Sequence, residues 1–442
     1  MRKNLFLFSV VALSCAMVSC SSSEDIDAGE TKQVVNMLPE SAPIELTHEQ
    51  VVFANYNNHF TLNFLEKVND ADRSGTSFIY SPLSITYVLG MVNDAATGQT
   101  EQELEQTLGF PQGGIQAVND YCKKLIDGLP KVDNKVTLNI ANALFVNKNI
   151  AKLKSQYQQE MQQYYDAKAE NLDFKSASTL KTINGWANDH TNGMIPEILD
   201  EVNPATVTYL LNAIYFKADW ASKFDQKNTK EESFITENGV THLPLMHQKV
   251  MIRYLKNDLY SAIEMPYGNG RWQMTVMLPE EGKTTDDVIS YLAKMGWSKD
   301  NIEGNMQVDN ISPMNGAYPH EVDLKLPRFE TASDTDDLSI GLIGLLKQMG
   351  IKLAFDGNLA EIPNMCEDGN VFISMMRQKA KIKVNEEGSE AAAVTIAGAN
   401  YTTSLTPTET PKATFHANRP FVYVISEETS GVLLFVGKFT GL

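Results

Sequence analysis

Residues 386–399 carry a small, uncharged side chain at every second position, and this alternation constrains the fold more than any other feature of the sequence. The alternate set is Ser389, Ala391, Ala393, Thr395, Ala397 and Ala399. Because side chains of a β-strand alternate between two faces, this whole set can point into a core while the residues between them point outward. The segment therefore has the pattern of a strand buried inside a sheet.

The composition of the same segment is unlike that of a resting strand. Gly388 and the alanines have low β-propensity, and a stretch rich in Ser, Thr, Asn, Gly and Pro continues to Thr414. Tracts of Ala, Ser, Thr and Gly also occur as plain flexible linkers, which is the alternative interpretation. We predict a loop over 386–414 that is able to insert into a sheet as a strand.

Motifs elsewhere in the chain favour the inserting loop over the linker. They are Tyr80-Ser81-Pro82-Leu83-Ser84-Ile85; Ile183-Asn184-Gly185-Trp186 with Thr191; Leu211 to Trp220; Leu326-Pro327-Arg328-Phe329; and Phe415 to Phe421. A further motif, here called the hinge, consists of Glu386, Glu387, Gly388, Ser389, Glu390, Ala391, Ala392 and Ala393. In this order the motifs resemble those of the serpins, from roughly Leu46 to Leu442.

The resemblance implies the serpin fold, in the α+β class. Such a domain has a mostly helical N-terminal part, large mixed and antiparallel β-sheets and an exposed reactive loop. Sequence patterns agree with this class, because helices are expected early and antiparallel strands late in the chain rather than as a βαβ repeat.

Hydrophobic periodicity predicts the main elements. An amphipathic helix is expected from Thr47, and further helices over Leu83–Val92, Glu101–Leu108 and 338–350. Long apolar runs at Ala141–Val146 and Tyr209–Phe216 predict central strands covered on both faces. Hairpins are expected around Gly268-Asn269-Gly270 and between Phe421–Ile425 and Val432–Phe439.

The N-terminal segment reads as a secretory signal. Arg2 and Lys3 precede an apolar run, and polar residues begin directly after Cys20. We expect a lipoprotein-type signal over 1–19, Cys20 as the lipid-modified first mature residue, a flexible tether over 20–45 and a single domain over 46–442. Cys15 and an ordinary cleaved signal are the alternatives. The predicted location is secreted or lipid-anchored at the bacterial outer membrane or cell surface.

Charge and cysteine content restrict the partners. The formal net charge is −18, and loss of the signal makes it more negative. Nucleic acid and heparin are therefore not expected as partners, because both bind to basic patches, and Lys123-Lys124 stands almost alone as a basic pair outside the signal. Membrane contact is expected only through the N-terminal lipid.

Cys122 and Cys366 are predicted to be free buried thiols, with one disulfide between them as the alternative.

No catalytic or metal-binding constellation was found, so the chain is not predicted to be an enzyme and no cofactor or metal is expected. The sequence has no Gly-x-Ser-x-Gly elbow, no His-Glu-x-x-His, no phosphate loop and no dinucleotide fingerprint. His242 and His247 lack helical ligand spacing, and His320 is expected to have an ordinary structural role.

The resemblance implies a protease inhibitor that acts as a suicide substrate. The protease cleaves the reactive loop, and insertion of the loop into the central sheet traps the acyl-enzyme. Counting from Glu386 predicts Thr402-Thr403 as the reactive bond, with Tyr401-Thr402 as the alternative. Elastase-like or chymotrypsin-like serine proteases are the expected partners, with papain-like cysteine proteases as a further class. No Lys or Arg lies between Gly388 and Pro411, which disfavours trypsin-like targets.

Two features depart from the family pattern. The stretch from Thr402 to Phe415 is longer than usual, and Gln378 stands where many serpins have a histidine beneath the opening sheet. Ser81 and Asn212 are its expected partners in this sheet-opening cluster, and an amide can hydrogen-bond to both.

Two other functional classes were weighed. A non-inhibitory serpin acting as a binding or carrier protein is the main alternative, although the small-residue hinge favours insertion. A glycan-capturing surface lipoprotein would suit the signal and tether, but the aromatic residues form no clustered stripe. The inhibitor is expected to be monomeric.

Overall fold

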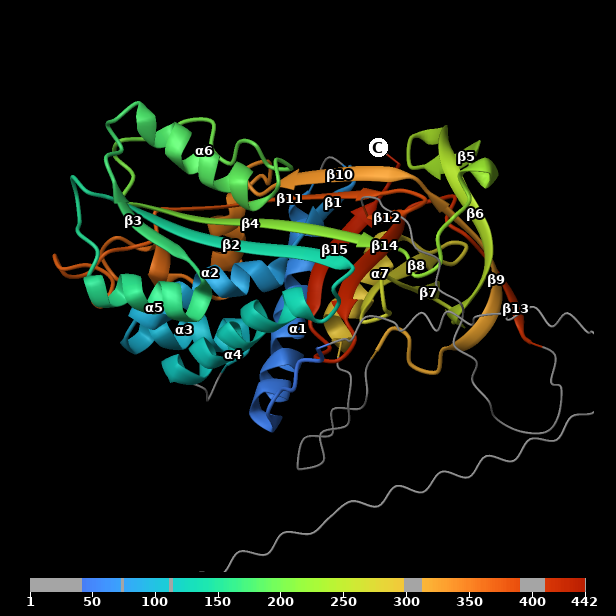
Figure 1. Cartoon of the computed structure of the whole chain (residues 1–442), viewed down its shortest axis with the longest axis horizontal. Helices are drawn as coiled ribbons and strands as arrows, with labels where there is room; N and C mark the ends of the chain where they lie inside the picture. Colours follow the sequence, from blue (N-terminus) through green and yellow to red (C-terminus); the bar gives the residue numbers. More distant parts are fainter. Residues whose placement is uncertain (1–41, 73–74, 111–113, 298–311, 390–409, 442) are drawn as a thin grey trace, which may run out of the picture. The chain divides into compact units, whose positions relative to one another are not determined.

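The computed structural model describes residues 42–72, 75–110, 114–297, 312–389 and 410–441. Within these ranges the helices are α1 (His48–Ala71), α2 (Pro82–Ala95), α3 (Gly98–Leu108), α4 (Gly114–Gly128), α5 (Ser155–Tyr165), α6 (Ser178–His190), α7 (Thr285–Met295) and α8 (Gly341–Met349). Short 3-10 helices are η1 (Leu129–Lys131), η2 (Gln226–Asn228) and η3 (Leu353–Phe355). The strands form two large sheets beside these helices (Figure 1), so the α+β expectation agrees with the structure.

The first sheet runs in the order β10-β11-β4-β2-β3, with β12 paired to β4. Its strands are β2 (Val136–Asn147), β3 (Lys168–Leu172), β4 (Thr208–Asp219), β10 (Phe329–Asp334), β11 (Met375–Val384) and β12 (Gly388–Ser389). The pairs β2–β4, β10–β11 and β12–β4 are antiparallel, whereas β11–β4 and β2–β3 are parallel. This mixed sheet contains both predicted central strands.

Both faces of this first sheet are covered. On β4, Leu210, Ile214 and Phe216 belong to the main core, whereas Tyr209 and Leu211 belong to a second, smaller core. This division follows the two-residue period of a strand. Figure 1 shows α6 on one face and α2 to α5 on the other. The central strands therefore read as continuous apolar runs because neither of their faces meets water.

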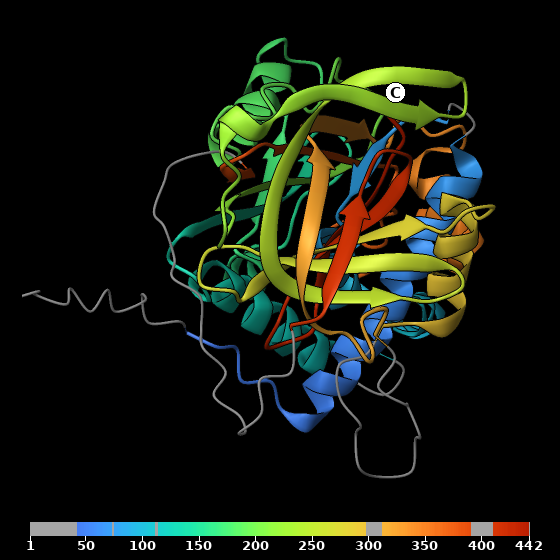
Figure 2. The same cartoon turned by 90° about the vertical axis from the view of Figure 1, so that its right-hand side faces the viewer.

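The second sheet runs in the order β1-β15-β14-β8-β7-β6-β9-β13, with β5 paired to β6. Its strands are β1 (Phe78–Tyr80), β5 (Lys230–Thr236), β6 (Gly239–Lys256), β7 (Tyr260–Pro266), β8 (Trp272–Pro279), β9 (Tyr318–Pro327), β13 (Lys412–His416), β14 (Phe421–Glu427) and β15 (Leu433–Phe439). In Figure 2 this sheet is in front, with the long β6 curving over it. Strand β13 lies at one edge of this sheet and runs parallel to β9.

The helices and hairpins expected from sequence are confirmed. Helix α1 starts after Thr47, whose hydroxyl accepts from the Gln50 N–H (3.2 Å) while the Gln50 side chain accepts from the Thr47 N–H (3.1 Å). Such a capping box satisfies two backbone donors of the first turn. The predicted Gly268-Asn269-Gly270 hairpin joins β7 to β8.

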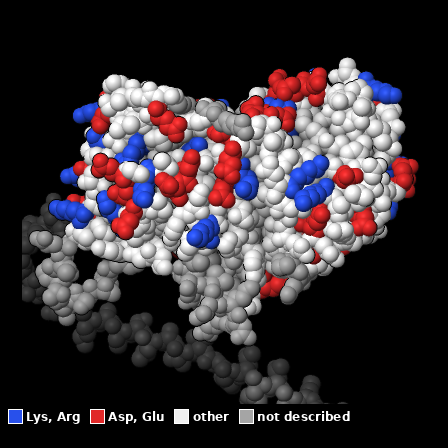
Figure 3. Space-filling model, turned by 180° about the vertical axis from the view of Figure 1, so that it is seen from behind, with Lys and Arg blue, Asp and Glu red and all other residues white. Residues whose placement is uncertain are grey.

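Two surface properties bear on partners. Within the described ranges, no helix has the length and hydropathy needed to cross a membrane. On the face seen in Figure 3, basic and acidic side chains are interspersed. Mixed charge of this kind gives no single-sign field over that face.

Candidate functional site

The hinge enters the first sheet at the end of β4. Gly388 and Ser389 form β12 and pair antiparallel with Asp219 and Ala218. Just before them the chain leaves β11 through a tight turn, in which Asn385 and Gly388 exchange N–H···O bonds of 2.9 and 3.2 Å. The start of the hinge is thus already a short strand lying between β11 and β4.

Gly388 is required at this position by both conformation and space. Its φ of +148° lies in the region that residues with a side chain rarely adopt. A Cβ built on Gly388 would lie 2.1 Å from the Ala218 carbonyl oxygen and 2.5 Å from the Asp219 Cα, closer than non-bonded atoms approach. Only glycine lets the hinge approach the β4 backbone so closely.

Glu386 anchors the hinge to two connecting segments, one just before β5 and one just after β9. Its side chain is 3% exposed and accepts hydrogen bonds from the Thr229 hydroxyl (2.6 Å) and from Arg328 Nε (3.2 Å). Burial acts to raise the pKa of Glu386, but the bonds from Arg328 and Thr229 outweigh it, so the pKa lies below its ordinary value. The neighbouring Glu387 forms a more exposed ion pair with Lys223 at 2.8 Å.

Ser389 is buried and contacts one member of a stacked pair of aromatic rings. It is 1% exposed, and its hydroxyl lies 3.0 Å from that of Tyr267. The Tyr267 ring stacks on Trp220 with centroids 4.3 Å apart, and Trp220 Nε1 donates to the Asn385 carbonyl (2.9 Å). Burial raises the pKa of Tyr267, so its hydroxyl stays protonated. Because Ser389 pairs with Ala218, a main-core residue, its side chain faces the core, as the alternating pattern predicts.

Below the hinge, the boundary between β11 and β4 has an open part and a closed part; we call this boundary the seam. In the closed part, Met375–Lys379 pairs with Tyr209–Ala213. In the open part, the strand pairings of the described residues join Ile214–Lys217 only to β2 and Ala380–Val384 only to β10. The sheet therefore has room for a strand directly below β12.

The three residues of the predicted sheet-opening cluster meet at the closed part of the seam. Gln378 is 1% exposed; its Nε2 donates to the Ser81 carbonyl (2.9 Å) and to Asn212 Oδ1 (3.4 Å), while its Oε1 accepts from the Ser81 N–H (3.0 Å). The Gln378 backbone also exchanges two bonds of 3.0 Å with Thr335. Glutamine therefore makes the contacts that were expected of it.

Several contacts of the hinge were not predicted from sequence. Trp220 and Arg328 stand inside quoted motifs, and Tyr267 directly precedes the predicted Gly268-Asn269-Gly270 turn. No local pattern shows which distant segment these side chains touch. The remaining predicted residues, Glu390, Ala391, Ala392, Ala393, Tyr401, Thr402, Thr403 and Cys20, lie outside the described residues.

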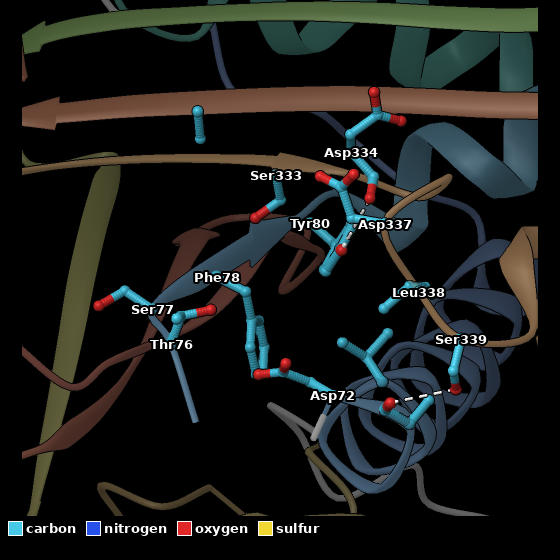
Figure 4. A pocket seen from close by; sticks show the side chains of 13 residues that line it. Asp72, Thr76, Ser77, Phe78, Tyr80, Ser333, Asp334, Asp337, Leu338 and Ser339 are labelled. Atoms are coloured by element: carbon cyan, nitrogen blue, oxygen red, sulfur yellow. Dashed lines mark hydrogen bonds between the residues drawn. The ribbon is translucent and has the colours of Figure 1, made fainter. Parts of the chain in front are cut away.

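A pocket of about 410 Å³ lies apart from these contacts (Figure 4). It is built from α1, β1, β10 and the turn after β10, and Phe78, Tyr80 and Asp334 line it. The Tyr80 hydroxyl donates to the Asp334 carbonyl (3.4 Å), and that of Ser339 to the Ala71 carbonyl (3.3 Å). No lining residue belongs to the hinge or the seam, so this pocket is not part of the candidate site.

The cysteines and histidines have structural surroundings. Cys122 and Cys366 are free and buried, and burial raises the pKa of both thiols, that of Cys366 to about 12. Such thiols are unreactive. His247 lies 2.8 Å from the Asp323 carboxylate, and the His320 ring lies against Tyr254 and Tyr318. Among the described residues, no three His, Cys, Asp or Glu side chains are arranged to hold a metal ion.

Comparisons with known proteins agree with this architecture. The family Serpin (serine protease inhibitor) matches residues 55–441. An uncharacterized serpin-like protein of Thermococcus kodakarensis is 29% identical over 384 residues, which cover 86% of this chain and 84% of that protein. Leukocyte elastase inhibitor of Xenopus tropicalis is 29% identical over 395 residues, which cover 86% of this chain and 97% of that protein.

The structural likeness extends over most of the chain. The crystal structure of Tengpin, a thermophilic serpin in its native state, superposes with a TM-score of 0.75 at 23% sequence identity, covering 91% of this chain and 96% of that one. The fold expected from the motifs is confirmed. Because the family match includes almost the whole described domain, from α1 through the hinge to β15, the chain belongs to the serpin family.

Proposed function

We propose that this serpin inhibits proteases as a suicide substrate. The protease's serine oxygen attacks the carbonyl carbon of Thr402, the C–N bond to Thr403 breaks, and the new amino group of Thr403 leaves with a proton. An ester then joins Thr402 to the enzyme. Insertion of the freed strand into the seam carries the attached enzyme away from the site of cleavage before water can hydrolyse the ester.

The observation that carries the proposal is the pairing of Gly388 and Ser389 with β4 above an open seam. Continuing that register downward would put Ala391 opposite Phe216 and Ala393 opposite Ile214, which are both main-core residues. Directly opposed residues share one face of a sheet. Small side chains are needed there because the space against Phe216 and Ile214 is already close to full density.

The same register gives Thr395 a distinct place. It would lie opposite Asn212 on β4 and, by continuation of the Asn385–Gly388 pairing, opposite Gln378 on β11. Gln378 and Asn212 face each other in the closed seam and share a 3.4 Å hydrogen bond. Full insertion must break that bond, and a threonine hydroxyl at this position can donate to one amide and accept from the other. The ability of Thr395 to bond to both amides supports the proposal that the loop inserts after cleavage.

The proposed targets follow from the residues around the reactive bond. Thr402 suits the small specificity pocket of an elastase-like protease, and Tyr401 suits a chymotrypsin-like one. The similarity to a protein named leukocyte elastase inhibitor supports the first class. Papain-like cysteine proteases remain a further proposed class, because they also form an acyl-enzyme.

We also propose that the inhibitor is a monomer held at the cell surface by a lipid on Cys20, or else secreted. The support is the sequence pattern around Cys20, with the polar stretch to residue 45 acting as a tether. Replacing Cys20→Ala is expected to move the protein from the membrane fraction to the soluble fraction of its producing cell. An unchanged distribution would exclude lipid attachment at this residue.

The decisive experiment incubates the protein, produced without residues 1–19, with neutrophil elastase, pancreatic elastase, chymotrypsin, trypsin and papain. Denaturing gels and mass spectrometry follow the products. We expect a complex that survives denaturation with an elastase-like or chymotrypsin-like enzyme, together with a released peptide that begins at Thr403. Cleavage without a stable complex would instead identify a non-inhibitory serpin.

A pair of variants separates insertion from cleavage. Ala391→Glu puts a charge on the face that must enter the core, and burying an uncompensated charge costs several kcal/mol. We expect this variant to be cleaved without forming the complex. Ala392→Glu adds the same charge on the opposite face of the strand, which already carries Glu390 and points away from the main core, and should still trap the protease. Equal behaviour of the two variants would exclude the proposed register.

A further inference from the structure

Buried polar side chains continue the sheet-opening cluster away from the seam. Asn212 Nδ2 donates to Asn142 Oδ1 (2.9 Å), and Asn142 Nδ2 donates to the Tyr165 carbonyl at the end of α5 (3.2 Å). Asn212 and Asn142 are each 1% exposed. The amides thus connect β11, β4 and β2 to the C-terminal end of α5.

The chain of hydrogen bonds then reaches the far end of α2. The Tyr165 hydroxyl donates to Asn119 Oδ1 (2.6 Å), and Asn119 Nδ2 donates to Asp94 Oδ1 (2.5 Å). Asp94 lies in the last turn of α2, whereas Ser81 directly precedes the first turn. Every residue of α2 is buried. One polar network therefore holds both ends of a fully buried helix and ends at the seam.

Asp94 is the one ionisable carboxyl in this network. It is 9% exposed, and its Oδ2 has no hydrogen-bond partner among the described residues. It lines a pocket of about 330 Å³ between α4 and α5, together with Glu160 and Lys154. The Lys154 amine is occupied by the Pro363 carbonyl (2.8 Å). No ion pair joins Asp94 to a lysine, arginine or histidine of the described residues, so its carboxylate is buried there without a bonded cation.

The surroundings favour a proton on Asp94. Burial raises the pKa of Asp94 to about 6; the hydrogen bond from Asn119 acts against this rise, and the nearby Glu160 adds to it. The other groups that act on Asp94 or its partners are Tyr157, Tyr165 and Cys122, and burial raises the pKa of each. They stay neutral near pH 6, which leaves Asp94 as the group of this network that changes charge there.

We propose that Asp94 is a proton-operated control point for the seam. With its proton, Asp94 can donate to Glu160 and accept from Asn119, and the network to Gln378 is complete. Without the proton, an uncompensated anion beside Glu160 loosens the packing of α2, α4 and α5, and the closed part of the seam opens more readily. The effect on the seam does not depend on protease inhibition; faster loop insertion at higher pH would rest on the proposed function.

The sign of the pH effect follows from linkage. The folded protein holds this proton more tightly than the unfolded chain, whose aspartate has an ordinary pKa of 3.8. Protonation of Asp94 therefore contributes its full stabilisation of the folded state at low pH. This stabilisation is lost as pH rises from about 4 through about 6. Each pKa unit corresponds to a tenfold change in the linked equilibrium, so the full effect is limited to roughly a hundredfold.

The test measures hydrogen exchange by mass spectrometry at about pH 5 and about pH 7.5, with rates corrected for intrinsic chemistry. For the wild type, opening of the amides in Tyr209–Ala213 and Met375–Lys379 is expected to rise about tenfold or more at the higher pH. Asp94→Asn keeps an acceptor for Asn119 and places a donor toward Glu160. In this variant the seam amides should therefore stay protected from hydrogen exchange at both pH values. The exposed Asp189→Asn is the control of equal charge and should behave as the wild type.

Tyr165→Phe tests whether the effect of Asp94 protonation on the seam depends on this hydrogen-bond network. It removes the hydroxyl that joins Asn119 to the α5 end, so we expect the thermal unfolding midpoint to keep its pH dependence while seam exchange loses it. A wild-type seam whose exchange is independent of pH, or an Asp94→Asn variant with the wild-type pH response, would overturn the proposal. If Asp94→Asn does not fold, Glu160→Gln replaces it: the seam transition must shift to lower pH, and an unshifted transition likewise rejects the control point.

Discussion

Glu386 and Gly388 illustrate how single residues of the hinge depend on distant parts of the chain. The hinge motif includes a glutamate and a glycine at these positions. The contacts that require them are made with other segments of the chain. Gly388 is needed because the backbone of β4 occupies the space of its missing side chain. Glu386 is buried as a carboxylate because Arg328 and Thr229 supply charged and neutral donors. Removing the partners of a buried charge is strongly destabilising, because the charge is then left without compensation.

Neutralising Glu386 is expected to release the hinge. Because its pKa in the folded protein lies below the ordinary 4.5, its stabilising contribution is present at neutral pH and is lost as pH falls below about 4.5. Glu386→Gln should lower the free energy of unfolding at pH 7 by about 1.5–3 kcal/mol, the range for hydrogen bonds to charged groups. Glu387→Gln, which disrupts a more exposed pair, should cost less than about 1 kcal/mol. Chemical denaturation of both variants at pH 7 and pH 4 provides the measurement, and equal costs would contradict the anchoring role.

Strands β11 and β4 determine what the hinge can do next. They are paired over part of their length and separated above it, while each keeps its other neighbour. The closed part contains Gln378, which replaces the histidine of many serpins and still bonds to Ser81 and Asn212. The seam is therefore held by a few buried side-chain bonds in addition to its backbone ladder, and its resistance to opening depends on them.

Removing the Gln378 side chain should weaken the seam selectively. Gln378→Ala leaves the buried Ser81 N–H without its partner, whereas the Ser81 carbonyl keeps the Ser84 and Ile85 N–H donors. We expect a loss of about 2 kcal/mol in the free energy of unfolding. Gln158→Ala is a matched control, because it removes an amide that donates to the Ala169 carbonyl at 2.9 Å; it should cost about 1 kcal/mol. Hydrogen exchange in Met375–Lys379 should quicken only in the first variant. Seam protection that is the same in both would show that the cluster does not hold the sheet.

In the molecule as a whole, the two described ends of the loop region belong to different sheets. Strand β12 pairs within the first sheet, and β13 lies at one edge of the second. An intact chain between them is tied to both sheets, so it could follow β12 down the full length of the seam only if β13 left the second sheet. A cut between them would remove that restraint, and the freed strand would gain partners on both sides. We infer that the uncut protein is held short of its most stable arrangement by connectivity.

Cleavage between residues 390 and 409 is therefore expected to stabilise the protein. Each added ladder bond contributes about 0.5–1.5 kcal/mol, so a strand inserted over the seam should raise Tm by roughly 10 °C or more. Differential scanning calorimetry before and after limited proteolysis measures this change. The Ala391→Glu variant, cut in the same way, should show little increase, because its strand cannot be buried. A wild-type Tm that stays constant on cleavage would exclude insertion.

Much of this molecule was readable from its local sequence. The helical spacing of apolar residues after Thr47, the apolar runs of β2 and β4 and the glycine-rich β7–β8 turn predicted their elements, because amphipathic helices, buried strands and tight turns are specified by residues close in sequence. The alternating small residues likewise predicted a segment able to enter a sheet, and the structure places its first member, Ser389, facing the core.

Tertiary structure alone decided which partners these segments meet. The stacking of Tyr267 on Trp220 over the hinge, the bonding of Arg328 to Glu386 and the path of amides from Gln378 to Asp94 each join residues far apart in the chain. Side-chain hydrogen bonds and desolvation depend on positions in space, and a short window of sequence carries no record of those positions. For the same reason the sequence could indicate that Asp94 is acidic but not that it is buried without a cation, which is the property that makes it sensitive to pH.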